Sequence, residues 1–465
     1  MRLLSHIHNN WNIGKNMGNT EYRYYDIRRV RGEATHIDID NTRIEQAGSV
    51  FYDTALIRVL GEFGWGVLSI DGEMVGDLMI REKLPTELIQ KALNTATLTN
   101  ERIEIAETTS GVHTIPKMKE DPRILSLEEK AEILLDIEKH AKKEEIVSTR
   151  IGYSEKTEQI SFASSHGDEY EYELVRSGFS VMAVSRRGSL SQMGYNREHT
   201  ISGIPLRSKH HLAAEAADTA IQLLDAHPAK GGRMKAILDP ELAGVFAHEA
   251  VGHAAEGDLV KEGSSILKKH IGKQIGPKEL TVVDDPTLEM FGFCPVDDEG
   301  TKTERTDIIS NGIMHAYLHS KETLAADIGY GIAGHSRGMP GDVPIVRMSN
   351  TFIAPGDCSY DELVENCRDG ILLMGSRGGQ VDPGRGIFQF NAEYGYLIEN
   401  GELGQMVRDV SLSGEILTTL HAITHIGDDL KLSSGFCGKS GQTIPVSDGA
   451  PHILLSDAVV GGSDV

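Results

Sequence analysis

The amino-acid sequence predicts an α+β fold, with a mixed α/β N-terminal domain followed by a β-rich C-terminal domain. Residues 22–69 and 145–206 alternate apolar and polar side chains and are broken by glycine and serine, which is typical of strands joined in hairpins. Amphipathic helical patterns follow both blocks. Beyond residue 280 short strand-like segments and glycines predominate, so we expect only a few short helices there.

Strand patterns open the N-terminal domain. Within residues 22–69, Arg31–Gly32 is a candidate turn, and the glycines at 61, 64 and 66 indicate bulges or tight bends. The preceding residues 1–20 lack the apolar core of a signal peptide. We expect them to form a disordered N-terminal extension.

Three helices are predicted in the same domain. Residues 84–98 form the first, with Pro85–Thr86 at its start. The second runs from about 124 to 143, and Ser126 with Glu129 supplies its capping box. Residues 208–227 form the third, a clearly amphipathic helix.

The domain boundary is predicted where the third helix ends, at Pro228 and Gly231–Gly232. The predicted parts are an extension of residues 1–20, an N-terminal domain of residues 21–230 and a C-terminal domain of residues 231–465. Beyond the boundary, Met234–Leu238 is a predicted strand, and Asp239–Pro240 opens a helix.

The composition describes a soluble globular protein and excludes several classes of partner. The chain has 46 basic and 69 acidic residues, a net charge of −23, whereas nucleic-acid binding requires a basic face. No apolar run of about 18 residues is present, so we expect no membrane-spanning helix and no membrane partner. The four cysteines are too few for a disulfide framework, so we expect a cytoplasmic protein with reduced thiols.

The segment HEAVGHAAEGD, residues 248–258, carries the densest chemistry in the chain. Two histidines beside a glutamate can hold a metal ion and activate a water molecule. His248 and His253 are five residues apart, so on a regular helix their side chains diverge by roughly 140°. A π-bulge or a break at Gly252 would restore a common face. The spacing therefore predicts a distorted metal-binding helix at residues 250–253.

Other residues could complete the site as a general acid/base, a third metal ligand or orienting groups. Glu249 is suited to act as a general acid/base that moves a proton from water to a leaving amine. Cys437 is the strongest candidate for a third metal ligand, because it is flanked by glycines and the nearby Lys439 would lower its pKa. His335, in a glycine loop, is a rival ligand. The residues that could orient these groups or contact substrate are Glu256, Asp258, His335 and Lys439, with surface caps as the alternative for the two acids.

The motif together with CGKSGQ at residues 437–442 resembles the TldD branch of the TldD/PmbA family of zinc metallopeptidases. The further blocks that agree are residues 298–314, 347–357, 378–401 and 427–432. The resemblance implies one zinc ion per chain held by His248, His253 and Cys437, with Glu249 as the general acid/base. It also implies hydrolysis of unfolded polypeptides or peptides in a channel enclosed by a dimer. The dimer partner is a PmbA-like paralogue or a second copy of the chain.

Two other interpretations stay open. One is a metal-dependent amidase or deacylase that acts on a small molecule. The other is a non-catalytic subunit with a structural zinc ion, which would require a fourth protein ligand. If the substrate is a peptide, edge strands of the β-rich domain would bind it by main-chain hydrogen bonds, and residues 344–354 and 386–398 are the candidate edges.

Overall fold

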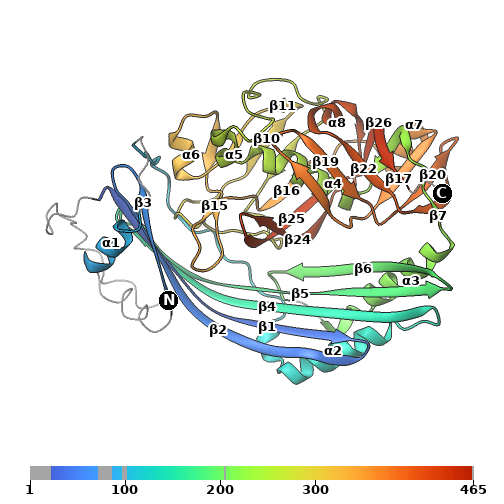
Figure 1. Ribbon diagram of the computed structural model, residues 1–465, viewed down its shortest axis with the longest axis horizontal. Coiled ribbons are helices and arrows are strands. Elements are labelled where there is room, and N and C mark those ends of the chain that lie inside the picture. The colour runs from blue at the N-terminus through green and yellow to red at the C-terminus, as the bar shows by residue number, and fades with distance from the viewer. Residues whose placement is uncertain (1–21, 72–85, 97–101, 204–205, 463–465) are drawn as a thin grey trace.

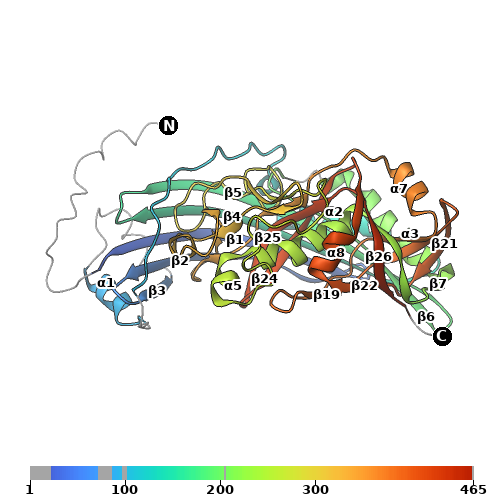
Figure 2. The same ribbon diagram turned by 90° about the horizontal axis from the view of Figure 1, so that it is seen from above.

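The computed structural model describes residues 22–71, 86–96, 102–203 and 206–462. Its first large feature is a six-stranded antiparallel sheet in the order β3-β2-β1-β4-β5-β6. The strands are β1 Tyr24–Asp40, β2 Arg43–Leu60, β3 Trp65–Asp71, β4 Ile146–Ser164, β5 Glu169–Arg187 and β6 Leu190–Thr200. The sheet curves beneath the C-terminal half of the chain (Figure 1), and its strands run along the long axis of the molecule (Figure 2). The strand patterns of the N-terminal half are thus confirmed, whereas residues 1–20 lie outside the described residues.

The hairpin between β1 and β2 corrects one prediction. It turns at Asn41–Thr42, whose φ angles are 49° and 65°, and not at Arg31–Gly32. Gly32 lies inside β1 opposite Tyr52, where an added Cβ would come within 2.7 Å of the tyrosine ring. This glycine therefore permits close packing between the strands and does not mark a turn.

Helices cover one face of this sheet. They are α1 Thr86–Leu93, α2 Leu127–Lys139 and α3 His210–Asp225. The predicted capping box of α2 is present, because Ser126 and Glu129 bond to each other's backbone amides. Gly66 of β3 lets α1 approach, since a Cβ there would meet the Ala92 carbonyl at 2.1 Å. The three predicted helices are confirmed with shorter ends, and Pro85 lies outside the described residues.

Alternation along each strand assigns the two faces of the sheet. Ile37 and Ile39 are buried against α2 and α3, together with Phe179 of β5. Asp38, between the two isoleucines, lines a cavity on the opposite face. The first sheet therefore has a dry face under its helices and a polar face directed at the C-terminal half of the chain.

Two more sheets build the C-terminal half. One has the order β11-β10-β9-β16-β25-β24. Its strands are β9 Val282–Asp284, β10 Thr306–Ser310, β11 Ile313–Met314, β16 Asn350–Ile353, β24 Lys431–Lys439 and β25 Gln442–Ala450. The other has the order β18-β19-β22-β26-β8-β17-β20-β21-β7, and β23 also pairs with β26.

The strands of that last sheet are β7 His227–Pro228, β8 Gly232–Leu238, β17 Gly370–Met374, β18 Gly379–Asp382, β19 Ile387–Asn391, β20 Tyr394–Glu399, β21 Glu402–Arg408, β22 Ser411–Glu415, β23 Ile423–Ile426 and β26 Ile453–Gly461. The α-helices of this half are α4 Pro240–Phe246, α5 Gly257–Glu262, α6 Lys321–Ala325, α7 Tyr360–Cys367 and α8 Ile416–Ala422. All are short, as predicted for a β-rich half. The division at residue 230 stays a proposal, and β7 just before it already pairs with β21.

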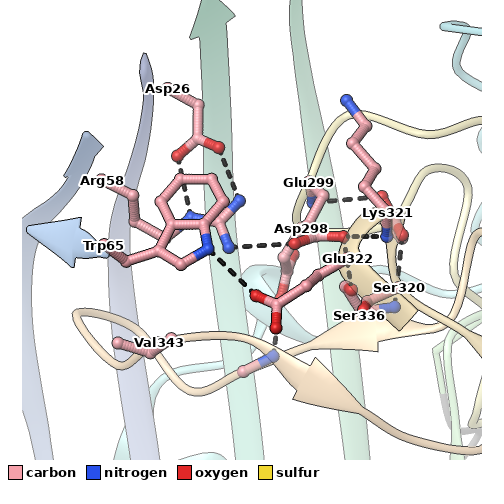
Figure 3. Close-up of polar contacts among 12 residues, drawn as sticks. Asp26, Arg58, Trp65, Asp298, Glu299, Ser320, Lys321, Glu322, Ser336 and Val343 are labelled. Atoms are coloured by element: carbon pink, nitrogen blue, oxygen red, sulfur yellow. Dashed lines mark hydrogen bonds and ion pairs between the residues drawn. The ribbon is translucent and has the colours of Figure 1, made fainter. Parts of the chain in front are cut away.

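A buried ionic network joins the first sheet to the C-terminal half (Figure 3). Arg58 of β2 pairs with Asp26 of β1 at 2.5 Å and with Glu299 at 3.0 Å. Nearby, the indole N–H of Trp65 donates to Glu322 at 3.0 Å. Arg58 and its two carboxylate partners are almost fully buried, so the network ties the sheet to the loop of the C-terminal half that carries Glu299.

Among the described residues, no helix is long and apolar enough to cross a membrane.

Candidate metal centre

The helix that carries both histidines is distorted in the predicted place. Strand β8 leads into α4, whose N-cap Asp239 accepts a hydrogen bond from the Leu242 amide at 2.8 Å. A π-helical turn, η4 (Ala247–Gly252), follows, and the amide of His253 donates to the carbonyl of His248. This i→i+5 bond widens the turn, so the two imidazole rings lie 5.2 Å apart at 90° to each other.

Gly252 does not break the helix; it allows close packing in this turn. Its φ and ψ of −56° and −58° are helical. An added Cβ would lie 1.9 Å from the sulfur of Met348, which is itself fully buried. The π-turn is therefore the form of distortion present, and glycine allows it to lie directly against Met348.

The third side chain of the cluster comes from the far end of the chain. Cys437, on the edge strand β24, is buried, and its Sγ lies 3.4 Å from Nε2 of His253. One ligand atom from each of His248, His253 and Cys437 lies within 4.8 Å of the others. No other group of three metal-ligating side chains meets this criterion within the described part of the chain.

The electrostatics of the cluster are those of a thiolate between two imidazoles. Burial alone would raise the pKa of Cys437, but His248 and His253 outweigh it and lower the pKa to about 4. Burial likewise opposes the charged form of His248, yet the Cys437 thiolate raises the pKa of this histidine to about 9. The pKa is lowered as predicted, and the groups that lower it most are the two histidines, with Lys439 not among them.

The donor set fits a zinc ion. Nδ1 of His248 is buried and has no hydrogen-bond partner among the described residues. A buried nitrogen without a partner is costly unless something binds it. One thiolate and two imidazoles are ligands that zinc prefers, and three protein ligands leave one position open. These three residues could therefore hold the ion that the sequence predicted.

A charged group binds the ring nitrogen of His253 that faces away from Cys437, and other charged groups hold it there. Glu256 is fully buried, and its Oε2 lies 3.0 Å from Nδ1 of His253 and 3.0 Å from Nζ of Lys439. Lys439 also bonds to Asp258 at 2.7 Å and donates to the Val346 carbonyl at 3.0 Å. Glu256 thus fixes which nitrogen of His253 faces Cys437, and Lys439 and Asp258 hold Glu256 in place.

His335 lies elsewhere. Its Nε2 is 3.3 Å from the Thr306 hydroxyl and 3.7 Å from Asp284, and its Nδ1 is 3.2 Å from the Ile332 carbonyl. The side chain is buried among these groups, and the structure does not bring it into the cluster with Cys437.

A cavity of about 530 Å³ opens beside the cluster. His248 and Glu249 line it from the helix side, and Glu249 Oε2 lies 3.9 Å from Nε2 of His253. Across the cavity lie Asp38 and Ser154 of the first sheet. The cavity therefore lies between two halves of the chain that are distant in sequence.

Sequence reasoning missed several residues of this cavity. Arg197 and His199 of β6, and Asp448 of β25, line it without belonging to any recognisable motif. The prediction of edge strands is wrong for residues 386–398, because β19 and β20 each have neighbours on both sides, and for β16 in residues 344–354. In that first block, β15 (Ile345–Val346) pairs only with β14 (Ser336–Arg337) and is an edge strand. The strands that end their sheets and line the cavity are β6, β18 and β24.

Several known proteins are similar to this chain in sequence or in fold. The PmbA/TldA metallopeptidase family models match residues 25–96 (domain 1), 120–224 (central domain) and 231–462 (C-terminal domain). A metalloprotease of Archaeoglobus fulgidus is 41% identical over 95% of this chain and 100% of its own. A zinc metalloprotease TldD homolog of Saccharolobus solfataricus is 33% identical over 68% of this chain and 72% of its own. The crystal structure of TldE from Thermococcus kodakarensis has the same fold, with a TM-score of 0.75 at 18% identity over 95% of this chain and 97% of that one. The chain belongs to the PmbA/TldD metallopeptidase family.

Proposed function

We propose that the protein is a zinc-dependent peptidase whose zinc ligands are His248, His253 and Cys437. The observation that carries the proposal is the meeting of these three side chains, from two distant segments, at the wall of a cavity that also contains Glu249. The zinc metalloprotease name of the Saccharolobus relative supports the choice of metal. Three ligands suit a catalytic site better than a structural one, which normally has four.

Glu249 is the proposed general acid/base. Its side chain is 31% exposed and faces the cavity, so water and substrate can reach the carboxylate. When bound, a zinc ion supplies positive charge that polarises a peptide carbonyl and acidifies water. Glu249 takes a proton from the attacking water and passes it to the leaving amine. Glu256 and Lys439 keep His253 in the orientation that this arrangement requires.

The proposed substrates are peptides or unfolded polypeptides. The cavity lies between the first sheet and the C-terminal half, and residues of both line it, so we expect an extended chain to reach Glu249 more readily than a folded protein. We further propose that the protein works as a dimer, with a PmbA-like paralogue or with a second copy of itself, which light scattering on the purified protein alone and with such a paralogue would test. All four cysteines are free, which supports the proposed cytoplasmic location.

The test is to measure bound zinc and the cleavage of an unfolded polypeptide, such as casein, for the parent protein and Glu249→Gln. We expect zinc near one ion per chain in both, with cleavage reduced at least about a hundredfold in the variant. Glu262→Gln, at an exposed position beyond the motif, is the matched control and should cleave normally. Equal cleavage by Glu249→Gln would contradict the proposal, and cleavage of small amides alone would favour an amidase.

A further inference from the structure

Asp448 is a buried carboxylate that lacks a protein partner. It lies on β25, and the residue is 7% exposed. Among the residues that the structure describes, none donates a hydrogen bond to its side chain or forms an ion pair with it. Buried carboxylates are normally paired, because removing a charge from water is costly. Burial accordingly raises the pKa of Asp448 to about 6, although His248 and Arg197 act in the opposite direction.

The carboxylate of Asp448 faces the proposed active site. In the register of β24 and β25, Cys437 pairs with Ile444 and Ser433 pairs with Asp448, so alternation places Cys437 and Asp448 on the same face. Gly435 lies between them, and a Cβ on it would be 3.5 Å from Oδ1 of Asp448. The missing side chain at Gly435 leaves the carboxylate open to the cavity that His248 and Glu249 line. The backbone position of Asp448, opposite Ser433, is four strand residues, or ~13 Å, from that of Cys437.

The surroundings of Asp448 are rich in negative charge. The cavity adjoins a second one of about 420 Å³, and both are lined by Arg197 and His199. The carboxylates that line the two cavities are Asp38, Glu249 and Asp448 in the first and Glu198, Glu241 and Glu393 in the second. Arg197 is the single lysine or arginine in the described lining, and it already pairs with Glu241 at 3.2 Å and donates to the Ser434 carbonyl at 2.7 Å. Arg197 therefore acts on Asp448 only through space, and no lysine or arginine of the described lining forms an ion pair with this carboxylate.

A second metal ion does not explain this carboxylate. Asp448 belongs to no group of three metal-ligating side chains with ligand atoms within 4.8 Å of one another, within the described part of the chain. A lone buried carboxylate beside a peptide-sized cavity is better suited to an ammonium or guanidinium group, which it can bind by charge-assisted hydrogen bonds.

We infer that Asp448 binds a positively charged group of the substrate, either a lysine or arginine side chain near the cleaved bond or a free N-terminal amine. This inference rests on the proposed peptidase function, because it assigns the substrate class of the same cavity. It makes the protein selective for cationic peptides, whereas the zinc ligands and Glu249 are indifferent to side-chain charge. Gly435 is then a specificity-determining position, since any side chain there would lie against the carboxylate.

The test is a binding measurement that does not depend on cleavage. Three fluorescein-labelled decapeptides are compared: an acetylated Ala/Ser peptide with one central lysine, its matched glutamine version, and the glutamine version with a free N-terminus. Binding is followed by fluorescence anisotropy on zinc-loaded Glu249→Gln protein. We expect the lysine peptide, the free-amine peptide or both to bind about ten- to a hundredfold more tightly than the neutral peptide. Which of the two gains affinity identifies the source of the charge.

The same preference is then measured after further substitution. Asp448→Asn should abolish it while zinc content stays unchanged, and Gly435→Val should weaken it by covering the carboxylate without removing it. Asp38→Asn, on the opposite wall of the cavity, is the matched control and should keep the preference. Equal binding of all three peptides, or an equal loss in Asp38→Asn and Asp448→Asn, would overturn the inference. Charge-selective binding without any cleavage of casein by the parent protein would instead refute the peptidase function and leave the role of Asp448 standing.

Discussion

The backbone amide of His253 donates its hydrogen bond to the carbonyl of His248, five residues earlier in the chain. In a regular α-helix the acceptor would be four residues earlier, and the two imidazoles would point away from each other. The single extra residue in the turn brings both rings beside Cys437. The geometry of the proposed metal centre therefore depends on one π-turn and on the groups that keep it in place.

Gly252→Ala should destabilise the protein, although alanine is the better helix former. Alanine gains about 1 kcal/mol over glycine inside a helix. The added Cβ would lie 1.9 Å from the Met348 sulfur, and such overpacking costs about 1–3 kcal/mol or more. We therefore expect a net loss of stability, measured as a lower urea midpoint, together with weaker zinc binding. Gly438→Ala, which meets no atom within 4 Å, is the control, and equal stability of the Gly252 variant and the parent protein would contradict the account.

Glu256→Gln should weaken zinc binding by about ten- to a hundredfold. The amide cannot supply the negative charge that now lies between Nδ1 of His253 and Nζ of Lys439. Competition with a chelator of known zinc affinity measures the effect. Asp258→Asn keeps the contact between Glu256 and His253, so its zinc affinity should fall much less. A Glu256 variant that held zinc as tightly as the parent protein would show that this carboxylate does not orient His253.

Glu393→Gln should reduce the pH dependence of stability between about pH 4.5 and 7. Burial raises the pKa of Glu393 from its ordinary 4.5 to about 7. In this window the folded state binds the proton of Glu393 more tightly than the unfolded state does. The stabilisation that comes from this bound proton is complete below pH 4.5 and is lost as the pH rises through 7. The loss is roughly 1–3 kcal/mol in the parent protein and absent in the variant. Urea titrations at several pH values measure it, and parallel curves for both proteins would be the contrary result.

Arg58→Ala should lower the free energy of unfolding by about 3–5 kcal/mol, because it leaves the buried carboxylates of Asp26 and Glu299 without their cation. Arg29→Ala provides a comparison on the same sheet. Arg29 pairs with Asp53 at 2.5 Å, but both side chains are partly exposed, so its loss should cost about 1 kcal/mol or less. Similar effects of the two substitutions in urea unfolding would argue that the network in Figure 3 does not fix the sheet in position.

Local spacing in the sequence predicted those features that depend on neighbours along the chain. The five-residue separation of His248 and His253 leaves few helical geometries that bring both rings together, and the π-turn is one of them. Ser126 and Glu129 similarly define a capping box by spacing alone. Arg31–Gly32 failed as a turn because a glycine inside a strand can also serve close packing, and the sequence does not show that Tyr52 lies across from it.

Features that depend on strand order could not be predicted in the same way. Strands β16, β19 and β20 have clear strand patterns, but pairing on both sides is a property of the sheet and leaves no mark on the sequence of any of them. The place of Asp448 could not be predicted either, because the register of β24 and β25 puts it on the same face as Cys437. The contacts of Lys439 were equally hidden, since chain proximity to Cys437 does not show that its ammonium group faces Glu256 and Asp258.

X-ray absorption spectroscopy at the zinc edge of the purified protein would report the ligands of the metal without any substrate. We expect one sulfur ligand at about 2.3 Å and two imidazole nitrogens at about 2.0–2.1 Å, with one further light atom. Cys437→Ser should remove the sulfur signal. A zinc site without sulfur, or a sulfur signal that persists in Cys437→Ser, would contradict the assignment of His248, His253 and Cys437 as the metal centre.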